Sequence, residues 1–366
     1  MNADRVRLRP EIESLVPYKQ GKPAAADAFK LSSNENPFDP LPAVLDAIAS
    51  ASVNINRYPD ASAALLREKI GKRFGVSSDC VQIGSGSVAI LAQLITAAAA
   101  PGDEVVYSWR SFEAYPVLTT VAGATSVPVA NTTDHKHDLP AIAAAITEKT
   151  RLVIVCSPNN PTGTIVTDAE FREFMAMVPP TVLVILDEAY VEFVGDPNSV
   201  NGVTLVGDYS NLVVLRTFSK AYGLAGLRVG YAVGPEYVIN AAKATALPLS
   251  VTAAAEHAAL VSLEHESELL ERVAGLVEYR ETLWAALVDQ GWDTPKSHGN
   301  FLWLPTGDLT QWAAGVFLEH GVVARAYGSD GVRVSVGEVE SVDKLLSAAA
   351  EVVTKLLSVR AEATLD

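Results

Sequence analysis

The chain has 366 residues, of which 49% are hydrophobic, and a formal net charge of −15 at pH 7. This length exceeds what a single hydrophobic core usually supports, so we expect one large and one smaller domain. The apolar content excludes general disorder, and the acidic charge argues against a nucleic-acid or anionic-membrane surface, because both need a basic face.

The two cysteines, Cys80 and Cys156, lie in or beside apolar segments without the spacing of a metal site. They are typical of reduced core thiols in a cytosolic protein. The N-terminus lacks the apolar stretch of a signal peptide, and no apolar segment reaches membrane-spanning length. We therefore expect a soluble cytoplasmic protein with no metal and no membrane contact.

Residues 1–40 are rich in proline and show little periodicity, so they are predicted to form an extended N-terminal arm. Its segment Leu31-Ser-Ser-Asn-Glu-Asn-Pro-Phe38 is dense in amide side chains. These serve either as turn formers or as hydrogen-bonding groups of a site, and composition alone favours turns.

Helices are predicted for residues 43–50 and 61–74, followed by a strand at residues 81–83. The strand enters Gly84-Ser-Gly-Ser87 and then an Ala/Leu/Ile-rich helix, an arrangement that offers backbone N–H groups to an anion. No Gly-Lys-Ser/Thr follows the glycines and the third glycine of a dinucleotide fingerprint is missing. A plain tight turn fits this segment equally well.

Short Val/Ile/Leu strands then alternate with helices, which predicts a mostly parallel sheet covered by helices on both faces. We assign residues 41–275 to this large α/β domain. Ligands bind beyond the carboxyl ends of the strands in such sheets, so polar residues there matter most. The strands are predicted at residues 104–107, 126–129, 151–156, 182–187 and 212–215, and the helices at residues 112–121, 139–146 and 167–177.

Three successive strand ends carry polar side chains. They deliver the amide of Asn160, the carboxylate of Asp187 with the phenol of Tyr190, and the amine of Lys220. Each has an ordinary structural explanation: a turn for Asn160, a helix cap for Asp187 and packing for Tyr190. Their occurrence together, at successive strand ends, favours a site.

The segment Arg216–Tyr231 presents Ser219, Lys220 and Arg228 between two apolar runs. A lysine whose pKa is lowered by burial and nearby cations can attack a carbonyl and hold it as an imine. Arg228 and Ser219 could bind a phosphate of the same molecule. A carbonyl and a phosphate on one small cofactor describe pyridoxal phosphate (PLP). An exposed Lys and Arg in a strand connection are the alternative.

The C-terminal part begins with helical segments at residues 251–263 and 269–287. A strand at 300–304, a helix at 309–320, strands at 322–325 and 332–336 and a helix at 342–357 then predict a compact α+β unit. We assign residues 276–366 to this smaller C-terminal domain. Arg325 and Arg333 lie on its strands, where a buried ion pair or a solvated edge is the ordinary explanation.

The combined motifs resemble those of fold-type I PLP-dependent aminotransferases over essentially the whole chain. The likeness rests on Asn159-Asn-Pro-Thr-Gly163, Asp187-Glu-Ala-Tyr190, Ser219-Lys220 and Gly226-Leu-Arg228. The segments Asn34-Glu-Asn-Pro37, Asn56-Arg-Tyr-Pro59 and 217–228 are closer to the histidinol-phosphate aminotransferase branch. Within that branch, the chain is most similar to bacterial aromatic amino acid aminotransferases.

The resemblance implies a role for each matching residue. Lys220 would bind the cofactor as an imine and later move a proton, Asp187 would pair with the ring nitrogen, and Tyr190 would hydrogen-bond the ring oxygen. The remaining cofactor contacts would be Ser85, Gly86, Ser87, Phe112, Asn160, Ser219, Arg228 and, from the neighbouring subunit of a homodimer with shared active sites, Tyr58. The substrate would contact Tyr18, Asn34, Asn160, Arg325 and Arg333, the last through a carboxylate. Many histidinol-phosphate enzymes have an acidic pair in place of Gly86-Ser87.

The implied reaction is a ping-pong transfer of an amino group between an aromatic L-amino acid and a 2-oxo acid such as 2-oxoglutarate. We favour aromatic substrates because of the overall likeness and the segment Trp109-Arg-Ser-Phe-Glu-Ala-Tyr115, although core packing also explains Trp109 and Tyr115. Histidinol phosphate is the alternative substrate, since Arg333 could bind its phosphate. A PLP-dependent decarboxylase of amino-acid phosphates and a non-enzymatic PLP-binding module are further alternatives, but the acidic chain shows no DNA-binding extension.

Overall fold

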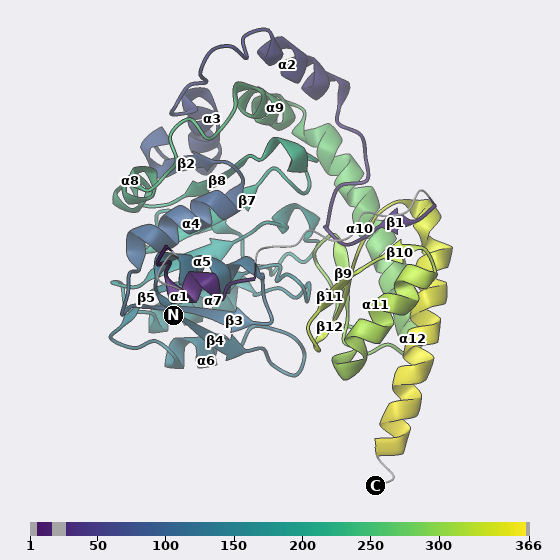
Figure 1. The fold of residues 1–366 in the computed structure, drawn as a ribbon. Coiled ribbons are helices and arrows are strands. Elements are labelled where there is room, and N and C mark those ends of the chain that lie inside the picture. Colours follow the sequence, from purple (N-terminus) through teal and green to yellow (C-terminus); the bar gives the residue numbers. More distant parts are fainter. Residues whose placement is uncertain (1–5, 17–26, 364–366) are drawn as a thin grey trace.

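The computed structural model describes residues 6–16 and 27–363 of the chain. A large sheet flanked by helices lies beside a smaller sheet with its own helices, and a long helix connects the two parts (Figure 1). Within the described residues, no helix combines the length and the apolar character that crossing a bilayer requires.

The large sheet has seven strands in the order β2, β8, β7, β6, β5, β3, β4. Strand β8 runs antiparallel to both neighbours, and every other pair is parallel. This arrangement confirms the predicted mostly parallel sheet. The strands are β2 Val81–Gly84, β3 Glu104–Trp109, β4 Thr125–Ala130, β5 Thr150–Cys156, β6 Leu183–Asp187, β7 Leu212–Thr217 and β8 Gly230–Val233.

Helices cover both faces of this sheet, as the alternation of buried residues along each strand requires. Ile185 and Val213 pack with helices α4, α5 and α8 on one face. Leu186 and Val214 are register partners on the other face. Leu186 packs with α6 and α7, and Val214 packs with α2, α3 and α9. These helices are α2 Pro42–Ser52, α3 Ala64–Phe74, α4 Ser87–Ala98, α5 Ala114–Ala122, α6 Leu139–Ala144, α7 Asp168–Met177, α8 Glu236–Ala244 and α9 Ala253–Glu264.

The smaller part follows the long helix α10, Glu266–Asp289. Its antiparallel sheet has the order β11, β12, β9 and packs on helices α11 and α12 around a separate hydrophobic cluster that includes Trp292 and Phe317. The elements are β9 Phe301–Leu304, α11 Thr310–Glu319, β11 Arg325–Tyr327, β12 Gly331–Ser335 and α12 Val342–Ala363.

One predicted strand of the smaller part is wrong. Residues 322–325 do not form a single strand, because β10 (Val322–Val323) pairs with the N-terminal arm while β11 begins at Arg325 and pairs with β12. The arm supplies strand β1 (Phe29–Lys30) for that pair, and it also contains the short helix α1 (Pro10–Glu13). The arm is therefore not extended throughout.

We propose to keep the division into an arm (residues 1–40), a large domain (41–275) and a small domain (276–366). The separate hydrophobic clusters of the two sheets support it. Two features cross these boundaries. Helix α10 is continuous over residues 275 and 276, and Leu31 of the arm is buried in the cluster of the smaller part.

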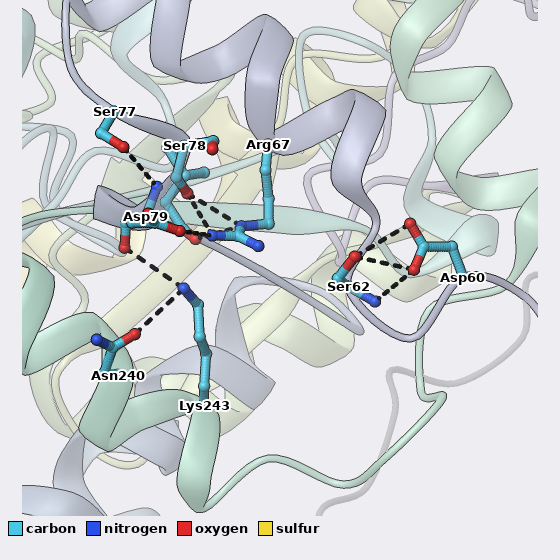
Figure 2. Close-up of polar contacts among 9 residues, drawn as sticks. Asp60, Ser62, Arg67, Ser77, Ser78, Asp79, Asn240 and Lys243 are labelled. Atoms are coloured by element: carbon cyan, nitrogen blue, oxygen red, sulfur yellow. Dashed lines mark hydrogen bonds and ion pairs between the residues drawn. The ribbon is translucent and has the colours of Figure 1, made fainter.

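Two separate groups of polar contacts fix the start of α3 and the turn that leads to β2 (Figure 2). The carboxylate of Asp60 accepts hydrogen bonds from the backbone N–H groups of Ser62 and Ala64, at 2.9 Å each. Helix α3 therefore begins at Ala64 and not at the predicted residue 61. The side chain of Arg67 donates to the carbonyl of Ser78 and to Asp79, so α3 holds the turn before the strand that ends in Gly84.

Candidate active site

The carboxyl ends of β5, β6 and β7 meet at one edge of the large sheet. The three strands are neighbours and parallel, and the register places Cys156 beside Asp187 and Asp187 beside Leu215. The hydrogen-bonding pattern continues past their ends, from Ser157 N–H to the carbonyl of Asp187. The loops that carry Asn160, Asp187 and Lys220 therefore start from the same edge, as the sequence predicts.

Lys220 lies half-buried between the large sheet and the arm. Its Nζ donates to the carbonyl oxygens of Ser33 and Asn34, at 3.0 and 3.2 Å, and lies 5.8 Å from the ring centroid of Tyr190. Burial first, and then the positive charges of Arg333 and Arg228, lower the pKa of Lys220 to about 7. A substantial fraction of the amine is thus neutral near pH 7 and able to attack a carbonyl.

Asp187 is buried, and its two carboxylate oxygens have different surroundings. Its Oδ2 accepts a hydrogen bond of 2.8 Å from the hydroxyl of Tyr115, whereas its Oδ1 is buried and has no partner among the residues that the structure describes. Burial raises the pKa of Asp187 to about 6, although the bonds from Tyr115 and from the backbone N–H of Ala189 lower it. A buried carboxylate oxygen without a donor points to a missing hydrogen-bond partner.

Tyr190 and Asn34 join the arm to the large sheet. Asn34 Nδ2 donates to the Tyr190 hydroxyl at 3.0 Å, and the Tyr190 ring packs edge-on against Phe301, with 4.9 Å between centroids. Burial raises the pKa of Tyr190. Asn34 has a positive φ of 53°, and both its backbone N–H and its Oδ1 bond to the hydroxyl of Ser335 in β12.

Arg333 reaches from the small sheet to the loop after β5. Its Nη1 donates to Asn160 Oδ1 and its Nη2 to the carbonyl of Ser32, both at 2.6 Å. Its Nε is buried and has no hydrogen-bond partner within residues 6–16 and 27–363. The hydroxyl of Tyr327 also donates to Asn160 Oδ1, at 3.4 Å. A buried guanidinium with an unpartnered donor is suited to an anionic ligand group.

A cradle for an anion forms where α4 begins. Gly86 has a φ of +80°, and a Cβ atom at this position would lie 2.5 Å from Nη2 of Arg228, so no other residue fits without displacing that arginine. Arg228 Nη1 contacts the hydroxyl of Ser219 at 3.4 Å. The structure thus brings together the guanidinium, a hydroxyl and the N-terminus of α4 at Ser87, with Ser85 just before it.

The other predicted site residues have different surroundings. The ring of Phe112 is partly buried and packs edge-on against Tyr115, with 5.6 Å between centroids. Arg325 forms an ion pair with Glu113, at 2.9 Å. Tyr58 is 87% exposed in the single chain. Tyr18 falls outside the described residues.

Four residues of this region were not assigned roles from the sequence: Tyr115, Tyr327, Ser335 and Glu113. The spacing of Tyr115, three residues after Phe112 in the helix predicted over residues 112–121, could have indicated a place beside the cofactor. Its fully buried ring, however, also fits the core-packing explanation. Among the described residues, no group of three His, Cys, Asp or Glu side chains could hold a metal ion.

These features fit the cofactor expected from the sequence. Lys220 supplies an amine of lowered pKa for a carbonyl, and Oδ1 of Asp187 can accept from a protonated ring nitrogen. The cradle of Gly86, Ser219 and Arg228 has donors and a positive charge for a phosphate. These residues therefore match the carbonyl, the ring nitrogen and the phosphate of PLP.

Comparisons with known proteins agree with this chemistry. The family model for aminotransferase class I and II matches residues 26–348. The chain is 50% identical to the aromatic amino acid aminotransferase of Streptomyces avermitilis, over 94% of this chain and 97% of that protein. It is 49% identical to the aromatic amino acid aminotransferase of Streptomyces coelicolor, over 96% and 99%. Among solved structures, it is similar to histidinol-phosphate aminotransferase from Sinorhizobium meliloti in complex with pyridoxal 5′-phosphate, with a TM-score of 0.87. The two sequences are 26% identical, and the match covers 97% of this chain and 99% of that chain.

Proposed function

Because the chain belongs to the class I and II aminotransferases, we propose that it transfers amino groups between aromatic L-amino acids and 2-oxo acids with PLP as its cofactor. The observation that carries the proposal is that neighbouring strand ends carry Lys220, whose pKa is lowered to about 7, and buried Asp187, whose Oδ1 accepts no hydrogen bond from the described residues. The names of the relatives at 50% and 49% identity support the aromatic substrates.

The proposed chemistry assigns distinct tasks to these side chains. When bound, PLP supplies an electron sink for the negative charge that develops at the substrate Cα. Lys220 would bind the cofactor carbonyl and then carry a proton to and from Cα. Asp187 would keep the ring nitrogen protonated, and Tyr190 and Asn160 would hydrogen-bond the ring oxygen. Ser85, Gly86, Ser87, Ser219 and Arg228 would bind the phosphate, and Phe112 would stack on the ring.

Arg333 would bind the α-carboxylate of the amino acid. Support comes from its buried guanidinium, whose Nε receives no partner from the described part of the chain. Asn34, Arg325 and Tyr18 complete the proposed substrate side. Histidinol phosphate remains the second candidate donor, because the structural similarity extends to the Sinorhizobium meliloti enzyme. That substrate has no α-carboxylate and would present its phosphate to Arg333.

A half-reaction with single amino donors tests the proposal. We expect phenylalanine or tyrosine, added without an acceptor, to remove the absorption band of the lysine-bound cofactor and to release the corresponding 2-oxo acid. We also expect kcat/KM to be higher for phenylalanine than for histidinol phosphate. A strong preference for histidinol phosphate would contradict the aromatic assignment, and release of CO2 without need for an acceptor would indicate a decarboxylase.

We further propose a homodimer in which Tyr58 reaches the cofactor phosphate of the neighbouring subunit. The exposed apolar side chains Val53, Ile55 and Tyr58 on the segment between α2 and α3 support an interface there. Sedimentation equilibrium should give twice the mass of one chain, and Tyr58→Phe should weaken PLP binding without separating the subunits. A monomer with full PLP affinity would contradict both parts of this proposal.

A further inference from the structure

Two arginines lie side by side on the small sheet. Arg325 of β11 and Arg333 of β12 are direct partners in the antiparallel register, so their side chains project from the same face. Like charges directly opposite each other repel and destabilise a strand pair. Arg333 is directed at Asn160 in the active site, and Arg325 is therefore the cation next to the proposed carboxylate-binding group.

The large domain supplies the countercharge for Arg325. Oε2 of Glu113 lies 2.9 Å from Nη2 of Arg325, and both side chains are only partly exposed. Glu113 directly follows Phe112, the residue proposed to stack on the cofactor ring, and directly precedes α5. The ion pair thus lies at the substrate end of the site and offsets one of two adjacent positive charges.

A second ion pair joins the same two segments with the charges reversed. Nε of Arg110, from the connection before α5, donates to Oδ2 of Asp330, in the turn between β11 and β12, at 2.6 Å. Its guanidinium also lies over the ring of Trp109, 4.3 Å from the centroid. Asp330 pairs with an arginine of the large domain, whereas Glu113 pairs with the arginine beside Arg333. Both ion pairs therefore cross between the domains, but only the one made by Glu113 involves the arginine directly opposite Arg333.

We propose that Glu113 determines substrate specificity. By holding Arg325 in an ion pair, it leaves Arg333 to bind the carboxylate of the amino acid substrate and disfavours amino-group donors that carry a phosphate. This inference rests on the proposed aminotransferase function. With two uncompensated arginines on one face, the site would suit a dianion that accepts from both guanidinium groups. With the Glu113 carboxylate in place, a phosphate meets a negative charge, while an uncharged aromatic ring meets no such penalty.

The test compares the holoenzyme and its Glu113→Gln variant, in which the side chain keeps its shape but loses its charge. We expect the ratio of kcat/KM for histidinol phosphate to kcat/KM for phenylalanine to rise on the order of tenfold, the effect of one partly screened charge a few ångströms away. The change should lie mainly in the KM for histidinol phosphate. Inorganic phosphate should also inhibit the phenylalanine half-reaction at lower concentration in this variant.

Matched variants distinguish charge from structure. Asp330→Asn removes the carboxylate of the other ion pair and should change kcat/KM for both donors by the same factor. Glu113→Asp keeps the charge and should keep the wild-type ratio. In the double variant Glu113→Gln/Arg325→Gln the ratio should return toward the wild-type value, because the cation that Glu113 compensates is gone.

The inference is overturned if active Glu113→Gln enzyme keeps the wild-type ratio within a factor of about two, well below the effect of one nearby charge. An equal shift in Asp330→Asn would also overturn it, because domain docking would then explain the change. Failure of the wild-type holoenzyme to react with phenylalanine is a different result, which refutes the proposed function itself. Should Glu113→Gln fail to fold, Glu113→Ala removes the same charge, and phosphate inhibition of its phenylalanine half-reaction no stronger than that of Asp330→Asn refutes the inference.

Discussion

Replacing Lys220 with alanine is expected to abolish transamination, lowering kcat by about 10⁴-fold or more because both the nucleophile and the proton carrier are lost. The purified variant should also lack the absorption band of the lysine-bound cofactor. The band and the half-reaction with phenylalanine can be measured on the same sample. A variant that retains both would show that Lys220 is not the cofactor-binding amine.

Lys220→Arg is the matched control, since it keeps a positive charge but has no nucleophilic amine, and it should be equally inactive. The wild-type protein adds a pH test. Burial, Arg333 and Arg228 lower the pKa of Lys220 to about 7, so the amine is protonated below this pH and neutral above it. The rate at which cofactor-free protein captures PLP should therefore rise with pH through about 7 and then level off. A rise centred near the ordinary lysine pKa of about 10.4 would contradict the proposed surroundings.

Asp187→Asn should have the second-largest effect, lowering kcat/KM by about 10²- to 10³-fold, which is typical for the loss of one electrostatic contact to developing charge. The amide cannot hold a proton on the ring nitrogen, so the cofactor would be a weaker electron sink. Equilibrium dialysis should also show weaker PLP binding. Wild-type PLP affinity together with wild-type kcat/KM in this variant would remove Asp187 from the site.

Tyr115→Phe is the control for this change. It removes the hydrogen bond to Oδ2 of Asp187 but leaves the carboxylate, so its effect on kcat/KM should be smaller. We expect a decrease of about tenfold, which corresponds to the free energy of one hydrogen bond to a charged group. Because the Tyr115 hydroxyl lowers the pKa of Asp187, the variant should raise that pKa above its value of about 6. An effect as large as that of Asp187→Asn would mean that Tyr115 acts directly on the substrate or cofactor.

Most of the large sheet could be predicted from the sequence because buried parallel strands are nearly continuous apolar runs. The run Leu212–Thr217, for example, was predicted to within two residues. Helix α8 was not predicted, although Val238, Ile239 and Ala242 form a buried helical face, because it lies in a short segment between two apolar runs. The two-residue pair of β1 and β10 had no local signal, since it depends on a contact between residues about 290 apart in the sequence.

The same distinction applies to the site. Asn160, Asp187 and Lys220 could be predicted together, because parallel strands end at one edge of the sheet. The pairing of Arg333 with Asn160 could not, because it joins two domains across 173 positions of the chain. Tyr115 is ambiguous for a physical reason: its ring packs in the core while its hydroxyl donates to Asp187, so core packing and a role in the proposed site give the same sequence pattern.

Asn34 connects the N-terminal arm to both the large and the small domain by hydrogen bonds. Its backbone and side chain bond to Tyr190 of the large domain and to Ser335 and Asn300 of the small domain, and its carbonyl also accepts from Lys220. A chain that began after residue 40 would lose a hydrogen-bonding wall shared by both domains. In an evolutionary series, deletions should therefore be tolerated at the C-terminal end of α12 far more readily than in the residues around Asn34.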